Sequence, residues 1–274
     1  SAKILWGTIS SYYGTKFSNW ILLKISLNFL SLYKRQLLFF LKKKIDIDKD
    51  KKANNLSLET LFIKFGSDKA NYWDNKKNNG HGYTKYYLKN LNKLKNKKLN
   101  ILEIGSYGGA SAAAFSKFFS NSKVYCLDIN ISNFKYTSKK INIFGADATK
   151  EKSYKDFLTK IHISNKKKYF DIIIDDGSHK LDDILNVLKF YFKHLKSNGF
   201  YIIEDYRLPN YFKHLNSLNE PKIDKIINSV RKKKRFNSKI LNKKFQNILF
   251  KEVSFIKNYH GIRKTSDVVF FKKI

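Results

Sequence analysis

The chain has 274 residues, enough for one large domain or two small ones with a sizeable buried core. Hydrophobic residues make up 42% and aromatic residues 16%, which excludes an intrinsically disordered protein. Lys and Arg number 55 against 22 Asp and Glu, a formal net charge of +33 that is typical of a nucleic-acid or membrane-surface partner. Only five of these residues are Arg, the side chain best suited to phosphates and base edges. We therefore interpret the charge mainly as a solvated surface, and nucleic acid is an open but not favoured partner.

The cysteine content excludes two further classes of protein, those with intrachain disulfide bonds and those with cysteine-based zinc sites. Cys126 is the single cysteine, so neither an intrachain disulfide nor a cysteine-based zinc site can form. This composition fits a cytoplasmic protein. The chain begins with Ser rather than Met, so we expect a processed or trimmed N-terminus and leave open whether a targeting segment was removed.

Residues 20–41 have a helical pattern with a wide apolar face. Lys24, Asn28, Ser31 and Arg35 recur every three or four residues and form a narrow polar stripe. Charges interrupt the segment, so it does not predict a membrane-spanning helix. Two interpretations stay open. The helix packs on the main domain or on a second copy of the chain, or it lies on an anionic membrane at the inner surface.

The next segments are more polar. Residues 42–55 are charged and rich in Asn, and we expect a linker that completes an N-terminal region over residues 1–55. Ser57 is placed to cap a helix over the apolar run 58–65, which Gly66 ends. A polar loop follows, and another helix begins near residues 81–87. Residues 56–98 are therefore expected to form a helical cap or substrate region.

From residue 99 onward, short apolar runs alternate with helical patterns. Strands are predicted at residues 99–105, 124–127, 141–144, 170–174 and 200–203, and helices at 110–119 and 181–195, the second closed by Gly199. The last two runs, 248–256 and 268–271, have no room for a crossover helix and should pair antiparallel. The pattern predicts a Rossmann-like, doubly wound α/β domain over residues 99–274. Its sheet is mostly parallel, with an antiparallel C-terminal edge hairpin and an N-terminal helical extension.

A glycine-rich loop follows the first of these strands. Residues 103–109 read Glu-Ile-Gly-Ser-Tyr-Gly-Gly and open a helix, where glycines let the backbone approach a ligand closely. Asp128 lies 23 residues after Gly105, at the end of the next strand, where a carboxylate can accept both ribose hydroxyls of an adenosine ligand. Asp147 ends the third strand and should lie near the adenine edge.

These residues resemble the motifs of class I S-adenosylmethionine-dependent methyltransferases. The narrower resemblance is to the metal-dependent macrolide-sugar (mycinamicin-type) and related polysaccharide O-methyltransferases. It is carried by residues 65–69 with 81–83, by residues 174–179 and by residues 202–205, and it covers residues 60–274. The helical pattern at residues 20–41 has no counterpart in it. The resemblance implies S-adenosylmethionine as cofactor, bound by Glu103, Gly105, Ser106, Tyr107, Gly109, Asp128, Asp147 and Asp175.

Four carboxylates end two consecutive predicted strands, at positions 175–176 and 204–205. They would repel one another unless a cation lay between them, and oxygen ligands without thiolates suit Mg²⁺ or Mn²⁺. By resemblance the metal ligands are Asp176, Glu204 and Asp205. Solvated strand-end acids without a metal remain the alternative.

His179 follows Asp176 by three residues, and an imidazole can act as a general base near neutral pH. With Asp176 it forms the expected catalytic pair. Asp68, Lys69, His81 and Tyr83 either close over the cofactor and acceptor or form a helix-cap and loop network.

The activity this predicts is divalent-metal-dependent O-methylation of a sugar hydroxyl in a glycan or glycosylated metabolite. An RNA methyltransferase that uses the basic surface is one alternative. A binding protein that kept the fold without the chemistry is another, and a cephalosporin-hydroxylase-like protein is a third.

Overall fold

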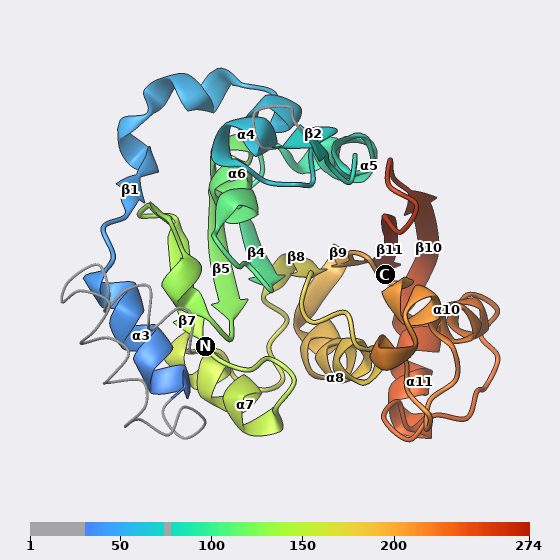
Figure 1. The fold of residues 1–274 in the computed structure, drawn as a ribbon. Coiled ribbons are helices and arrows are strands. Elements are labelled where there is room, and N and C mark those ends of the chain that lie inside the picture. Colours follow the sequence, from blue (N-terminus) through green and yellow to red (C-terminus); the bar gives the residue numbers. More distant parts are fainter. Residues whose placement is uncertain (1–30, 74–77) are drawn as a thin grey trace.

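The computed structural model describes residues 31–73 and 78–274 (Figure 1). The helical pattern predicted for residues 20–41 lies only partly inside this range. Its described part is helix α3, Ser31–Leu41. Within the two described stretches, every helix is too short or too polar to cross a membrane.

A seven-stranded sheet forms the centre of the described structure, in the order β10-β11-β9-β8-β4-β5-β7. Its strands are β4 Leu99–Ile104, β5 Ser122–Asp128, β7 Ile141–Gly145, β8 Phe170–Asp175, β9 Leu195–Ile203, β10 Val253–His260 and β11 Asp267–Lys273. The pairs among β4, β5, β7, β8 and β9 are parallel, and β11 pairs antiparallel with both β9 and β10. The predicted mostly parallel sheet with a C-terminal antiparallel hairpin is therefore confirmed.

Helices cover both faces of the sheet (Figure 1). One face carries α4 Leu58–Phe65, α5 Thr84–Leu91 and α6 Ala110–Phe118, and the other carries α7 Glu151–Lys160, α8 Leu181–Tyr191, α10 Ile223–Arg231 and α11 Lys243–Glu252. Alternate strand residues enter the two cores: Ile101 packs on the α4–α6 side, and Leu102 on the α7–α11 side. This alternation also decides which face each strand-end acid points to.

Two predicted boundaries are wrong. The apolar run 248–256 is not one strand, because residues 248–252 end α11 and β10 begins at Val253. Gly199 does not close a helix; α8 ends at Tyr191 and Gly199 lies inside β9. A Cβ at Gly199 would lie 2.8 Å from the Asp171 carbonyl oxygen, so the glycine allows a close approach between strands β8 and β9.

Residues 42–55, expected as a linker, are packed against the domain. The short strand β1, Ile45–Asp46, pairs parallel with β6, Tyr136–Thr137, and two 3₁₀ helices follow at Ile47–Lys49 and Lys51–Asn55. Asp48 accepts hydrogen bonds from the Ser138 hydroxyl and the Lys139 backbone. This segment is therefore tied to the loop between β5 and β7.

The region between α4 and α5 is held by its own backbone. Ser57 caps α4 through the Thr60 backbone N–H, and Gly66 ends it in a left-handed conformation, both as predicted. The Tyr83 N–H donates to the Lys69 carbonyl, and the Gly82 N–H donates to the Ala70 carbonyl. The two halves of the first sequence motif, residues 65–69 and 81–83, are thus directly paired.

Helix α3 exposes large apolar side chains. Phe40 is 76% exposed, Leu41 55% and Leu37 50%, directly before the basic run at residues 42–44. An interfacial helix buries side chains of this kind below lipid headgroups.

The expected membrane contact predicts that Phe40→Ser combined with Leu41→Ser weakens binding to anionic vesicles at least about tenfold, because each apolar side chain contributes about 1.5–3 kcal/mol on burial. Vesicle sedimentation is measured at a salt concentration that screens the net charge. Leu218→Ser, at a fully exposed leucine elsewhere, is the matched control. Equal sedimentation of all three proteins would contradict the membrane contact.

Candidate active site

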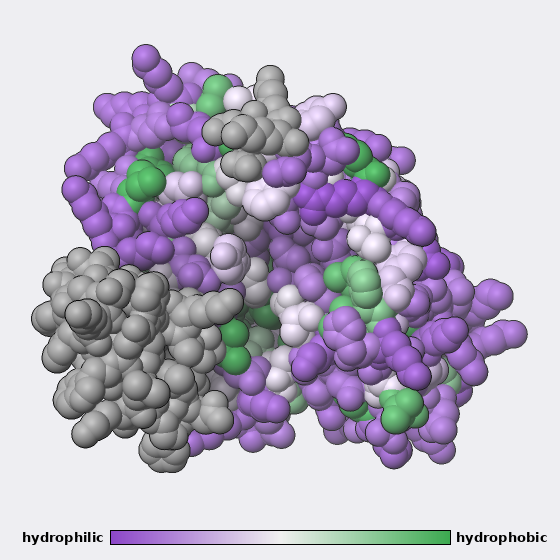
Figure 2. Space-filling model, viewed as in Figure 1, coloured by the Kyte–Doolittle hydropathy of each residue, from purple (hydrophilic) through white to green (hydrophobic). Residues whose placement is uncertain are grey.

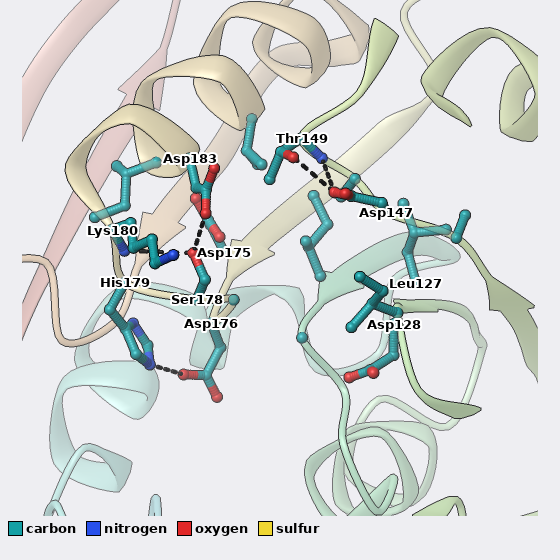
Figure 3. Close-up of a pocket in the computed structure, with 18 of the residues that line it drawn as sticks. Leu127, Asp128, Asp147, Thr149, Asp175, Asp176, Ser178, His179, Lys180 and Asp183 are labelled. Atoms are coloured by element: carbon teal, nitrogen blue, oxygen red, sulfur yellow. Dashed lines mark hydrogen bonds and ion pairs between the residues drawn. The ribbon is translucent and has the colours of Figure 1, made fainter. Parts of the chain in front are cut away.

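A pocket of about 490 Å³ opens at the carboxyl ends of the parallel strands. Seen as a surface, this face of the molecule is mostly hydrophilic, with some hydrophobic residues around a hollow over the ends of β4 and β5 (Figure 2). In the close-up, Asp128 and Asp147 lie on one side of the pocket, and residues 175–180 lie on the other (Figure 3). The pocket therefore lies between the two groups of acids that the sequence singled out.

The turn after β4 depends on Gly105. Its φ of +83° is unfavourable for other residues, and a Cβ there would lie 1.9 Å from the Asp176 carbonyl oxygen. The Asp176 N–H donates to the Ile104 carbonyl at 2.9 Å. The glycine loop and the acidic loop after β8 are consequently in direct backbone contact.

Asp128 is fixed by its own neighbourhood. Its Oδ2 accepts the Tyr107 N–H at 2.8 Å, and its Oδ1 accepts the Asn130 N–H at 2.6 Å. Each oxygen keeps a second lone pair, so the carboxylate is oriented and still able to accept ligand hydroxyls. Asp147 is anchored similarly, because its Oδ1 accepts both the backbone N–H and the hydroxyl of Thr149.

The predicted cofactor residues divide into two groups. Gly105, Tyr107, Asp128, Asp147 and Asp175 line the pocket, and Glu103, Ser106 and Gly109 do not line it. Glu103 is fully buried on the α6 side of β4, where Ser111 donates to it. The structure thus places Glu103 behind the pocket wall, in the position of a structural acid.

Asp175 is a buried carboxyl group that faces the pocket. Burial raises its pKa to about 8, and its Oδ2 has no hydrogen-bond partner among the described residues. The group is therefore largely protonated at neutral pH and retains a free polar atom in the pocket wall.

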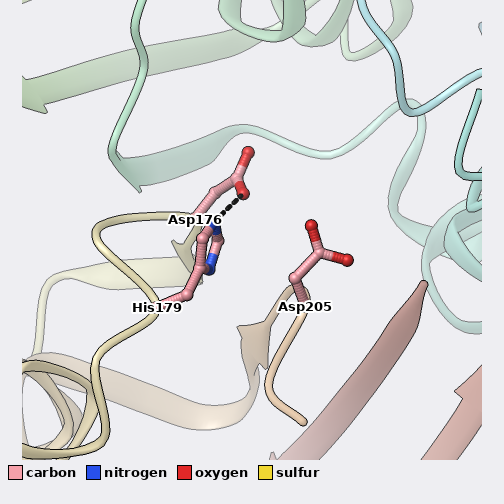
Figure 4. Close-up of side chains that lie close together, drawn as sticks. All are labelled: Asp176, His179 and Asp205. Atoms are coloured by element: carbon pink, nitrogen blue, oxygen red, sulfur yellow. Dashed lines mark ion pairs between the residues drawn. The ribbon is translucent and has the colours of Figure 1, made fainter. Parts of the chain in front are cut away.

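Asp176, His179 and Asp205 meet at one end of the pocket (Figure 4). Their ligand atoms all lie within 4.8 Å of one another, and His179 Nε2 is 3.8 Å from Asp176 Oδ1. Two carboxylates and an imidazole at this spacing suit a hard divalent cation such as Mg²⁺ or Mn²⁺. The sequence-based ligand set shares Asp176 and Asp205 with this cluster and differs in Glu204.

Glu204 has other partners. Its Oε2 lies 2.7 Å from Lys69 Nζ, and its Oε1 accepts the Tyr87 hydroxyl. Lys69 Nζ also lies 2.5 Å from Asp176 Oδ2. Burial works against the charge of Lys69, but Asp176 and Glu204 hold its pKa well above the usual range, so the ammonium stays charged.

Tyr83 and His81 bind the last acid. The Tyr83 hydroxyl donates to Asp205 Oδ1, and His81 Nδ1 lies 3.3 Å from the same oxygen. Burial opposes protonation of His81, yet Asp205 and Asp68 outweigh it and raise its pKa to about 10. The four residues expected as a lid or loop network, at positions 68, 69, 81 and 83, therefore support the acids from behind.

The sequence analysis missed two residues of the site: Tyr87, which binds Glu204, and Lys180, which lines the pocket. Tyr87 was detectable, because Tyr83 and Tyr87 are four residues apart and four-residue spacing puts side chains on one helix face. Lys180 lines the pocket from the loop before α8, and no motif marks it.

Three non-glycine residues of this site have left-handed backbone conformations. They are Tyr107 at φ 43°, His179 at φ 58° and Asp205 at φ 49°. Such conformations cost energy and persist where surrounding contacts impose them, which is typical of functional sites.

Comparison with known proteins agrees with this geometry. The family model described as "Methyltransferase domain" matches residues 102–206. This segment of the chain is therefore similar to a methyltransferase domain. The match begins in β4 and ends just after Asp205, so it includes the glycine loop, Asp128 and both acidic strand ends.

Curated proteins that resemble this chain include O-methyltransferases of Streptomyces. The chain is 27% identical over 132 residues to demethylmacrocin O-methyltransferase of Streptomyces fradiae, covering 46% of this chain and 32% of that one. It is 30% identical over 155 residues to L-olivosyl-oleandolide 3-O-methyltransferase of Streptomyces antibioticus, covering 54% and 36%. The chain thus spans about a third of the length of these relatives.

A solved structure shares the fold. It is the MycE methyltransferase of the mycinamycin biosynthetic pathway in complex with Mg, SAH and mycinamycin VI. Its TM-score is 0.59 at 19% identity, over 80% of this chain and 54% of that one. The resemblance to class I S-adenosylmethionine-dependent methyltransferases of the macrolide-sugar type is therefore confirmed.

The adenosine interpretation of Asp128 gives a test. Asp128→Ala should weaken S-adenosylhomocysteine binding by about 1.5–3 kcal/mol, the range for hydrogen bonds to a charged acceptor. Calorimetry measures the affinity, and Asp156→Ala, at an exposed acid on α7, serves as control. Unchanged affinity in Asp128→Ala would remove this carboxylate from the ribose site.

Proposed function

We propose that the chain is an S-adenosylmethionine-dependent O-methyltransferase that needs a divalent cation and acts on a sugar hydroxyl of a glycosylated acceptor. The observation that carries the proposal is that Asp176 and His179 belong both to the wall of the pocket and to the three-residue acid and imidazole cluster. A methyl donor bound in the pocket would therefore lie beside the groups able to hold a cation and accept a proton.

The cofactor is supported by the pocket and by the relatives. Asp128 and Asp147 offer oriented carboxylates, and the backbone at Gly105 leaves room for close approach. The relatives are named as O-methyltransferases, and some of these names include a glycosyl group, as in L-olivosyl-oleandolide and 8-demethyl-8-alpha-L-rhamnosyl tetracenomycin-C. The structure of the mycinamycin-pathway enzyme contains Mg and SAH. These names favour a glycosylated small molecule over a polysaccharide.

Each residue has a distinct part in this proposal. Asp176 and Asp205 are the metal ligands common to the sequence motif and to the observed cluster, and Glu204 is the third by resemblance. A bound divalent cation would lower the pKa of a chelated sugar hydroxyl, and the sulfonium cofactor would supply an electrophilic methyl carbon. His179 would take the hydroxyl proton on Nε2, the nitrogen that faces Asp176. The remaining contribution of the site is alignment of acceptor oxygen and methyl carbon.

Metal removal tests the first half of the proposal. EDTA should abolish methyl transfer to a panel of the acceptors named by the relatives, such as demethylmacrocin and mycinamycin VI, and Mg²⁺ should restore it while S-adenosylhomocysteine binding persists. Glu204→Gln should reproduce the loss, since one anionic ligand is replaced by a neutral one of the same shape. Glu220→Gln, at a buried glutamate remote from the motifs, is the matched control. Full methyl transfer in the presence of EDTA, or methyl transfer to RNA under the same conditions, would contradict the metal mechanism and favour the RNA-methyltransferase alternative.

Removal of the base tests the second half. His179→Ala should lower turnover by about 10²–10⁴-fold, the usual range for a positioned general base, with metal and cofactor affinities unchanged. His214→Ala, at an exposed histidine, should keep wild-type turnover. A His179→Ala protein that loses metal affinity instead would show that the imidazole is a ligand, as the three-residue cluster allows. Full turnover would assign proton removal to another group.

A further inference from the structure

Lys69 occupies the space between two of the acids. Its side chain is 2% exposed, and its ammonium contacts Asp176 Oδ2 at 2.5 Å and Glu204 Oε2 at 2.7 Å. The backbone is fixed as well, because the Lys69 carbonyl accepts the Tyr83 N–H at 2.8 Å. The ammonium thus comes from a segment far away in the chain and is held at the ends of β8 and β9.

Several negatively charged groups surround the single positive charge of Lys69. Asp176, Glu204 and the buried Glu103 all act electrostatically on this one ammonium. Glu204 has its second oxygen on Tyr87, and Asp176 turns its second oxygen toward His179. Consequently Lys69 binds the one Glu204 oxygen that is not already engaged by a tyrosine.

We propose that Lys69 is an internal counter-ion of the acid cluster that competes with a divalent cation for Glu204 and Asp176. The inference rests on the proposed metal site and adds a residue that sets its affinity. In this arrangement Lys69 is a positioning residue: it does not reach the pocket, and it acts through the two carboxylates. A cation that takes Glu204 must displace the ammonium from Oε2 or share that carboxylate with it at short range, where two positive charges repel.

If Lys69 supported the metal ligands instead of competing with the metal, its removal would change metal affinity in the opposite direction. If Lys69 only orients Glu204 and Asp176 for the metal, its removal should weaken metal binding, because the ligands lose their alignment. If Lys69 competes, its removal should strengthen metal binding. The sign of the change therefore separates competition from support.

The experiment is Mn²⁺ titration of the full chain by calorimetry, comparing the wild type with Lys69→Met, which keeps the side-chain length and removes the charge. We expect Lys69→Met to bind Mn²⁺ at least about tenfold more tightly. Mn²⁺ should also raise the melting temperature of Lys69→Met by more than that of the wild type. Lys273→Met is the matched control. Lys273 is also buried and paired with a glutamate, Glu252, but it lies at the last residue of β11, outside the acid cluster.

Equal or weaker Mn²⁺ binding by Lys69→Met overturns the competition and leaves the metal site standing. Absence of Mn²⁺ binding in both proteins removes the metal site, and the competition with it. S-adenosylhomocysteine binding in the same samples reports the cofactor site independently.

A measurement on the wild type decides the question if Lys69→Met does not fold. Crystals grown with Mn²⁺ should show Lys69 Nζ beyond hydrogen-bond distance of Glu204 Oε2, with Mn²⁺ located by its anomalous signal. An ammonium still bonded to both carboxylates beside a bound Mn²⁺ overturns the proposal.

Discussion

Carboxylates at the ends of neighbouring strands can be buried together in their ionised form only if a cation stays close to them, because each loses its hydration and repels the others. Here the Lys69 ammonium meets this requirement for Asp176 and Glu204, and the protonated His81 meets it for Asp205. The other features of the site follow from that constraint. The region between α4 and α5 must lie against the sheet, since it supplies both cations, and the strand ends must stay in register to share them.

The α4–α5 region is accordingly a wall of the site. Lys69, Tyr83 and Tyr87 are all buried, and each of them donates a hydrogen bond to a strand-end acid. If the α4–α5 region moved to close over the pocket, Lys69, Tyr83 and Tyr87 would lose their hydrogen bonds to the strand-end acids. In the proposed function, the acceptor would therefore approach from the pocket side, which His179 and Asp176 line.

Much of the fold could be predicted from the sequence because its strands are short apolar runs that end at glycine or aspartate. The positions of Asp128, Asp147 and Asp176 at strand ends followed from the same pattern. The boundary at Val253 could not be predicted, because residues 248–256 are apolar enough for either a helix or a strand. The role of Lys69 was equally hidden: a lysine in a polar loop looks solvated until the acids it pairs with, more than a hundred residues away, are placed beside it.

The contact between the two strand-end loops has a thermodynamic consequence. Gly105 lies directly against the Asp176 carbonyl, so the turn that borders the cofactor pocket cannot shift without moving the backbone of a proposed metal ligand. Two ligands that bias the same backbone position are energetically linked, and the linkage is reciprocal. Whatever factor a nucleoside bound in the pocket would impose on cation affinity, the cation would impose on nucleoside affinity, because the backbone contact at Gly105 joins the two loops.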